Sequence, residues 1–162
     1  MAIPAADKYL LFRIAGQRLA FPLSAVRELL PAAAVTRPLD APRWLLGFLR
    51  LGRETLPVAE LAVLLGLPSN TLTLQSHFIR PVEGPVWLVD RVEQIVTAPE
   101  LTPLPASHFI NEYAAGSFQD EGDDVIVLRL RRLLLMEERE RIAQITQREH
   151  ARRLEAGVGA DA

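Results

Sequence analysis

The segment Ala20-Phe-Pro-Leu-Ser-Ala-Val-Arg-Glu-Leu-Leu30 has a counterpart in Val86-Trp-Leu-Val-Asp-Arg-Val-Glu-Gln-Ile-Val96. The two stretches align without a gap, and their apolar positions coincide at 20/86, 21/87, 23/89, 26/92, 29/95 and 30/96. Short apolar runs bounded by turn residues are typical of β-strands. This pair of segments therefore predicts one β module that occurs twice in the chain.

Further equivalences extend the repeat beyond these two segments. Trp44 and Gly47 correspond to Tyr113 and Gly116, and the later stretches that correspond are Pro38-Leu39 with Pro103-Leu104 and Val58-Ala-Glu-Leu61 with Val127-Leu-Arg-Leu130. The repeat spacing of about 65 residues exceeds the 20–50 residues that are typical of solenoid units. Two copies within one domain instead predict a seam between the halves, where a partner can bind.

Turn signals divide each half into five short strands. We expect strands at 9–14, 18–23, 26–30, 45–51 and 55–59, a helical turn at 60–66, and then strands at 77–82, 86–90, 92–98, 114–118 and 124–128. Closing a sheet on itself removes its exposed edges. The sequence thus predicts an all-β fold with a C-terminal helix, in which two five-stranded SH3-like barrels are formed by about 15–68 plus part of the second half, and by 76–128.

The end of the chain has a different composition. Residues 131–155 contain no Gly or Pro and are rich in Arg, Glu, Gln, Leu and Ala, which favours a helix. We place this helix at 135–155 and expect a frayed tail at 156–162. Basic helices can bind nucleic acid, but Glu residues are interleaved with the Arg residues here, so a solvated or partner-facing helix is the better interpretation.

Composition narrows the class of protein. The 162 residues include no Cys and carry a net charge of −2, so there is no disulfide framework, no thiolate site and no global field that would attract nucleic acid. The first residues lack the pattern of a signal peptide, and the longest apolar runs fall far short of the roughly 20 residues that a membrane helix needs. We expect a cytoplasmic protein that does not insert into membranes.

Catalytic and ligand-binding motifs are weak throughout. Ser24, His77 and Asp90 have the residue types of a hydrolase triad but lack the Gly-x-Ser-x-Gly turn. The histidines are isolated, no glycine cluster can cradle a phosphate, and the acidic stretch 120–124 lacks the spacing of a Ca²⁺ loop. The sequence therefore predicts no enzyme activity, no metal and no cofactor.

Several segments together resemble the CheW family of chemotaxis coupling proteins. They are Leu11-Phe-Arg-Ile-Ala-Gly-Gln-Arg-Leu-Ala-Phe-Pro-Leu-Ser-Ala-Val-Arg-Glu-Leu-Leu30, Pro42-Arg-Trp-Leu-Leu-Gly47, Leu56-Pro-Val-Ala-Glu-Leu61 with Leu64-Leu-Gly-Leu67, and Leu88-Val-Asp-Arg-Val-Glu93. The resemblance covers about residues 8–134 and implies two five-stranded SH3-like barrels packed around a shared core.

The resemblance also implies a function. CheW-like proteins are adaptors without catalytic activity that link the cytoplasmic tips of methyl-accepting chemoreceptors to a CheA-type histidine kinase. Carried over by position, the partner-binding residues would be Val26, Arg27, Glu28, Leu29, Leu49, Arg53, Val58, Val89 and Val92. The apolar members would line a groove between the barrels, and the charged ones would set orientation and partner choice.

The sequence departs from the family pattern at one turn. The family usually has Asn-x-Arg-Gly before its Pro-Val strand, whereas this chain has Arg50-Leu-Gly-Arg53. Two alternatives stay open at this point. One is an accessory adaptor in a chemosensory system that controls type IV pili, and the other is an SH3-like peptide-binding module of another pathway.

Overall fold

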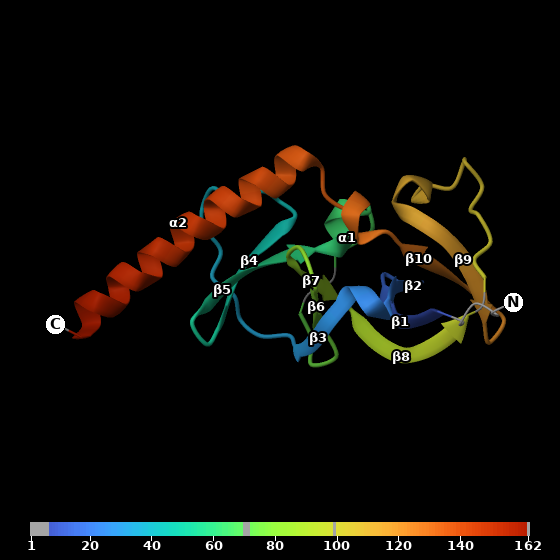
Figure 1. The fold of residues 1–162 in the computed structure, drawn as a ribbon, viewed down its shortest axis with the longest axis horizontal. Helices are drawn as coiled ribbons and strands as arrows, with labels where there is room; N and C mark the ends of the chain where they lie inside the picture. The colour runs from blue at the N-terminus through green and yellow to red at the C-terminus, as the bar shows by residue number, and fades with distance from the viewer. Residues whose placement is uncertain (1–6, 70–71, 99, 162) are drawn as a thin grey trace, which may run out of the picture.

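The computed structural model describes residues 7–69, 72–98 and 100–161 and contains two five-stranded sheets (Figure 1). The first sheet has the order β8-β1-β2-β10-β9. Its strands are β1 (Asp7–Ile14), β2 (Gln17–Pro22), β8 (Arg91–Ala98), β9 (Ala114–Asp120) and β10 (Asp123–Leu128). All neighbouring pairs are antiparallel except β2 and β10, which are parallel.

The second sheet repeats this plan with the order β3-β6-β7-β5-β4. Its strands are β3 (Val26–Pro31), β4 (Leu45–Leu51), β5 (Glu54–Glu60), β6 (His77–Pro81) and β7 (Val86–Val89). Here the parallel pair is β5 and β7. Each strand of one sheet therefore has a counterpart five strands away along the chain, which confirms the duplication.

The two copies exchange strands. The first sheet takes β1 and β2 from the first copy and β8, β9 and β10 from the second, and the second sheet takes the remaining five. Both sheets thus combine strands of both copies, where the sequence led us to expect such mixing in one barrel only. The edge strands of each sheet are not paired with each other in the described residues, so the sheets are open rather than closed barrels.

The edge strands β3 and β8 carry matching irregularities. One extra residue interrupts the pairing of β3 with β6 between Val26 and Glu28, and another interrupts the pairing of β8 with β1 after Val92. Such bulges increase the local twist and bend a strand. Because both lie at aligned positions of the repeat, they bend the two edges in the same way.

The shared core lies between the sheets. Phe12 and Phe21 of the first sheet and Ile79 and Trp87 of the second belong to one buried cluster, and the rings of Phe12 and Phe21 lie 4.8 Å apart. Smaller clusters fill the concave side of each sheet separately. Since the largest cluster draws on both sheets, the two halves form one folding unit.

A short helix or 3₁₀ turn follows the last strand of each copy. The helix α1 (Leu61–Leu64) follows β5, and the 3₁₀ turn η3 (Leu130–Arg132) follows β10. Two further 3₁₀ turns are η1 (Leu23–Ala25) and η2 (Asn111–Tyr113).

The C-terminal helix α2 (Met136–Asp161) lies across β4 and β5 and extends past the sheet (Figure 1). Glu138 caps its start, because its carboxylate accepts the backbone N–H of Leu135 at 2.8 Å. The helix begins one residue later than expected and continues through 156–161, where a frayed tail was predicted; residue 162 lies outside the described residues. No helix of the described chain is long and apolar enough to span a bilayer.

Candidate partner-binding site

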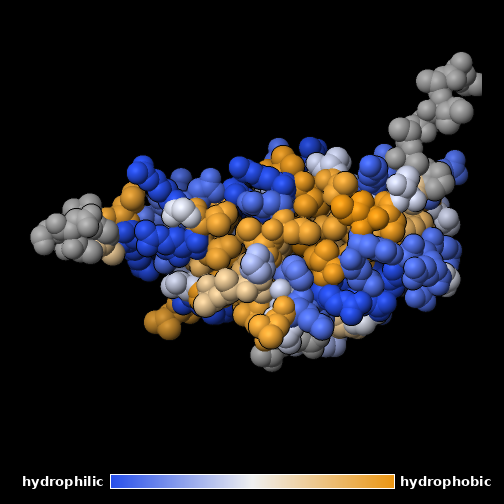
Figure 2. Space-filling view, turned by 90° about the horizontal axis from the view of Figure 1, so that it is seen from below, coloured by the Kyte–Doolittle hydropathy of each residue, from blue (hydrophilic) through white to orange (hydrophobic). Residues whose placement is uncertain are grey.

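The edge strands β3 and β8 expose apolar side chains at equivalent positions. Leu29 on β3 is 43% exposed, and Ile95, its counterpart in the repeat, is 54% exposed on β8. Figure 2 shows a band of hydrophobic residues across the face of the molecule that carries these strands. Large apolar side chains gathered on one face are typical of a protein–protein interface.

The predicted charged residues on and near β3 differ in their surroundings. Arg27 is exposed, whereas Glu28 is half-buried and accepts a hydrogen bond from Arg80 at 2.9 Å. Arg80 also binds the carboxylate of Glu54 at 2.6 Å. The hydrogen bond to Glu28, together with the one to Glu54, raises the pKa of the Arg80 guanidinium against the opposing effect of its burial. Glu28 is thus held beside β6, while Arg27 is free to contact a partner.

The predicted apolar residues fall into two groups. Val26 and Val92 are half-buried against the shared core, and Leu49 is half-buried against the cluster of the second sheet. Val58 and Val89 are 0% and 1% exposed. Side chains buried to this extent have no surface to offer a partner, so their placement assigns Val58 and Val89 to packing. Arg53, in the turn between β4 and β5, is exposed.

A network of ion pairs connects β8 to β2 and β9 of the same sheet. The guanidinium of Arg18, in a residue that is 7% exposed, donates to Glu93 of β8 at 3.2 Å and to Asp120 of β9 at 2.7 Å. Burial by itself would raise the pKa of the Glu93 carboxyl, but the hydrogen bond from Arg18 and the charges of Arg13 and Arg18 outweigh it and hold that pKa below its ordinary value. The carboxylate stays charged and fixes β8 to β2.

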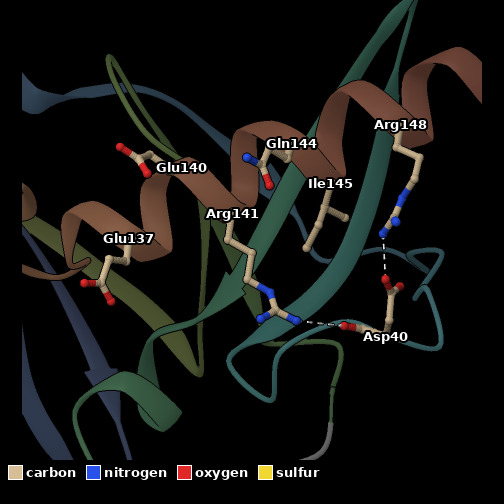
Figure 3. A pocket seen from close by; sticks show the side chains of 7 residues that line it. All are labelled: Asp40, Glu137, Glu140, Arg141, Gln144, Ile145 and Arg148. Carbon is tan, nitrogen blue, oxygen red and sulfur yellow. Dashed lines mark hydrogen bonds and ion pairs between the residues drawn. The ribbon is translucent and has the colours of Figure 1, made fainter.

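Helix α2 is attached by two buried apolar residues, of which Ile142 packs in the shared core, and by several polar contacts. Ile145 is buried against Leu45 and Phe48. Figure 3 shows the polar side, where Arg148 binds the carboxylate of Asp40 at 2.7 Å and Arg141 donates to the Asp40 carbonyl at 3.4 Å. The hydrogen bond from Arg148 lowers the pKa of Asp40.

One further contact lies closer to the C-terminal end of α2. His150 Nδ1 lies 3.2 Å from the hydroxyl of Thr55. The loop before β4 and the start of β5 thereby hold the helix on the sheet.

A groove lies between the sheets, beside α2 and η3. Its cavity volume is about 970 Å³. Residues from both sheets line it, among them Pro22, Pro57 and Trp87, and η3 and α2 close its other side. This groove contains none of the predicted partner-binding residues, so it is distinct from the apolar edges of β3 and β8.

The residues considered for hydrolase chemistry have structural contacts. Asp90 accepts the backbone N–H of Ala15 at 2.8 Å, and His77 Nδ1 lies 2.8 Å from the carbonyl of Gln75. Over residues 7–69, 72–98 and 100–161, the structure contains no group of three or more His, Asp or Glu side chains placed to hold a metal ion.

Two duplicated sheets with apolar outer edges define a protein-binding scaffold, and the comparisons with known proteins agree. A family model described as "CheW-like domain" matches residues 8–80. The chain is 30% identical over 136 residues to a "Chemotaxis protein CheW" of Rhizobium meliloti (strain 1021), covering 80% of this chain and 88% of that protein. The chain therefore belongs to the CheW-like family of chemotaxis coupling adaptors.

A solved structure supports the fold independently. The crystal structure of the scaffolding protein TtCheW from Thermoanaerobacter tengcongensis superposes with a TM-score of 0.74 at 19% sequence identity. The match covers 83% of this chain and 92% of that protein. At this identity the similarity concerns the fold, and it confirms the predicted CheW-like architecture with its two five-stranded sheets.

Sequence reasoning missed two features of these surfaces. Ile95 was aligned with Leu29 in the repeat but was not chosen as a contact residue, although the equivalence itself was a sufficient signal. The groove at η3 and α2 gave no local motif, because its lining residues come from strands and helices that are far apart in the sequence.

Proposed function

We propose that this chain couples the cytoplasmic tip of a chemoreceptor to a CheA-type histidine kinase in the cytoplasm, and that it does so by binding alone, without catalysis. Membership of the CheW-like family supports this assignment. The single structural observation that supports it most is the pair of equivalent apolar edges, with Leu29 on β3 and Ile95 on β8.

The receptor contact is proposed for the face that carries β3 and β8. Leu29 and the half-buried Val26 of β3, together with the half-buried Val92 of β8, supply the apolar part, and an amphipathic helix of a receptor hairpin can place its apolar stripe there. Arg27 is exposed beside Leu29 and would contribute mainly to orientation and to the rate of association, as rim charges generally do. Glu28 contributes indirectly, because Arg80 holds it.

A reconstitution experiment tests the proposal. The purified chain is mixed with a receptor cytoplasmic fragment and a CheA-type kinase, and complex formation is measured by co-sedimentation. We expect Leu29→Asp and Ile95→Asp to remove the chain from the receptor pellet while the melting temperature stays near that of the unmodified chain. Leu154→Asp is the matched control, because Leu154 is 59% exposed on α2, away from this face. Undiminished receptor binding by both edge variants would contradict the proposal.

A further inference from the structure

The groove beside α2 combines an apolar floor with a basic rim. Pro57, Trp87, Leu134 and Ile142 are among its apolar lining residues, and Arg129, Arg131, Arg132 and Arg139 surround it. Glu83 is the only acidic residue that lines it. This separation of apolar and cationic groups corresponds to an amphipathic partner that carries negative charge.

The four arginines of the rim have no carboxylate partner among the described residues. Elsewhere in the chain, Arg18, Arg80 and Arg148 all form ion pairs at 2.6–2.7 Å. Arg139 donates to the backbone carbonyl of Arg131, which holds its guanidinium beside η3 but leaves its charge uncompensated. Unpaired guanidinium groups around a dry surface attract carboxylates, which they bind through two parallel hydrogen bonds.

Two buried polar atoms of the lining are also without partners. The indole N–H of Trp87, in a residue that is 1% exposed, has no hydrogen-bond acceptor, and the hydroxyl of Thr146 on α2 has no partner either. Buried polar groups in native proteins are nearly always hydrogen-bonded, so each exception calls for an explanation. Both residues line the same groove, but the two polar atoms themselves are shielded from the surface, so they lie in the wall of the groove and do not contact a partner directly.

We propose that this groove binds an acidic amphipathic helix of a partner protein. The apolar stripe of the helix packs on Pro57, Val82 and Leu130, which keep accessible surface in the groove, and its flanking carboxylates pair with the arginines of η3 and with Arg139. The proposal concerns a surface other than the β3 and β8 edges, so it does not depend on the receptor contact proposed above.

Helix α2 supplies one wall of the groove and so contributes to the choice of partner. Arg139, Ala143, Thr146 and Gln147 of α2 all line the groove. These residues lie outside the duplicated strands, so the groove is complete only when α2 is seated on β4 and β5. The helix thereby adds a binding surface that the two sheets alone do not form.

A peptide titration tests the proposal. The probe is a synthetic helical peptide of about 15 residues with leucines along one face and glutamates on both flanks, and its counterpart carries lysines in place of the glutamates. Because the chain has two tryptophans, the indole N–H signals of ¹⁵N-labelled protein report the site directly. We expect the acidic peptide to shift the Trp87 indole signal, because Trp87 lies in the wall of the groove, to leave Trp44 unchanged and to bind less tightly as salt is added.

Variants distinguish binding in this groove from binding at the β3 and β8 edges. Arg131→Glu combined with Arg132→Glu should weaken binding of the acidic peptide at least tenfold, and Ala143→Glu should abolish the Trp87 shift. Leu29→Asp should bind the peptide as the unmodified chain does. The proposal is overturned if neither peptide shifts Trp87, if the lysine peptide binds as well as the acidic one, or if the arginine variants bind undiminished.

Discussion

Gly47 and Gly116 occupy the same place in the two sheets, and each lies against the backbone of the loop that precedes its strand. A Cβ added at Gly47 would lie 2.7 Å from the carbonyl oxygen of Thr36, and one added at Gly116 would lie 2.9 Å from that of Thr102. Backbone hydrogen bonds hold each loop there, from Thr36 to Phe48 and from Thr102 to Ser117. The proline-rich loops are therefore fixed to β4 and β9 by contacts that only glycine permits.

Replacing either glycine by alanine should destabilise the chain. The added methyl group meets backbone atoms that cannot move aside, so we expect Gly47→Ala and Gly116→Ala each to lower the free energy of unfolding by at least about 2 kcal/mol. For a chain of this length that corresponds to a melting temperature about 4–8 °C lower. Gly52→Ala is the control: its φ of +61° disfavours alanine by about 1 kcal/mol, but the added Cβ has nothing within 4 Å. Equal losses at all three positions would contradict the role given to the close contacts.

Substitution by aspartate should distinguish the residues that pack in the core from those that contact a partner. Val58 is fully buried, so Val58→Asp places a carboxylate in the apolar interior and should prevent cooperative folding. Leu29→Asp should melt near the temperature of the unmodified chain, because the leucine is 43% exposed. Circular dichroism melts of the two variants measure this difference directly. A folded Val58→Asp variant that has lost its partners would show that Val58 belongs to the docking surface after all.

Replacing the buried Ile145 should weaken the packing of helix α2 on β4. Ile145 is 6% exposed and packs on Leu45 and Phe48, so Ile145→Asp should release the part of α2 that follows the buried Ile142 while the sheets stay folded. Limited trypsin digestion then cleaves after Arg148 at low protease concentration. Leu154→Asp, on an exposed part of the same helix, should be cut like the unmodified chain. If Ile145→Asp resists trypsin equally well, the buried Ile142 and the polar contacts to Asp40 are together sufficient to hold the helix.

Acid should weaken the attachment of β8. The pKa of Glu93 is lower in the folded chain than its ordinary value of 4.5, so its contribution to stability is complete above that pH and is lost as the pH falls through the folded value. Glu93→Gln should therefore be less stable than the unmodified chain at pH 7, and the difference should shrink below about pH 4.5. Urea unfolding at several pH values measures this difference in the free energy of unfolding. Glu121→Gln, in the exposed β9–β10 turn, serves as the control. A constant difference at all pH values would show that Glu93 acts through packing rather than charge.

The ten strands were predictable because each is short, apolar and bounded by turn residues. The bounds of β4 agree residue for residue with the expected 45–51, and those of the other strands agree to within about two residues. The same patterns cannot distinguish an outward apolar residue from an inward one on a strand with a bulge. Leu29 was therefore grouped with Val58 and Val89, although only Leu29 is at the surface.

The exchange of strands between copies was only partly predicted. Hydrophobic spacing identifies strands but does not say which strands pair, and the pairing of β1 with β8 joins residues that are 78 to 91 positions apart, from Arg13 with Arg91 to Asp7 with Ala98. The groove at α2 was missed for the same reason, since Trp87 and Thr146 meet only in the folded chain. Which strands pair, and which residues line the groove, depends on the topology of the whole chain. Local sequence patterns determine both only weakly.

The exchanged strands mean that neither copy is a self-sufficient unit. Each supplies two strands to one sheet and three to the other, so a single copy alone would present incomplete sheets with unpaired edges. Two such copies on separate chains would complete each other only by intertwining, as in a domain-swapped homodimer. The present fold is the covalently joined equivalent of that dimer, and both copies therefore contribute to each surface: β3 and β8 to the exposed edges, and strands of both sheets, together with α2, to the groove.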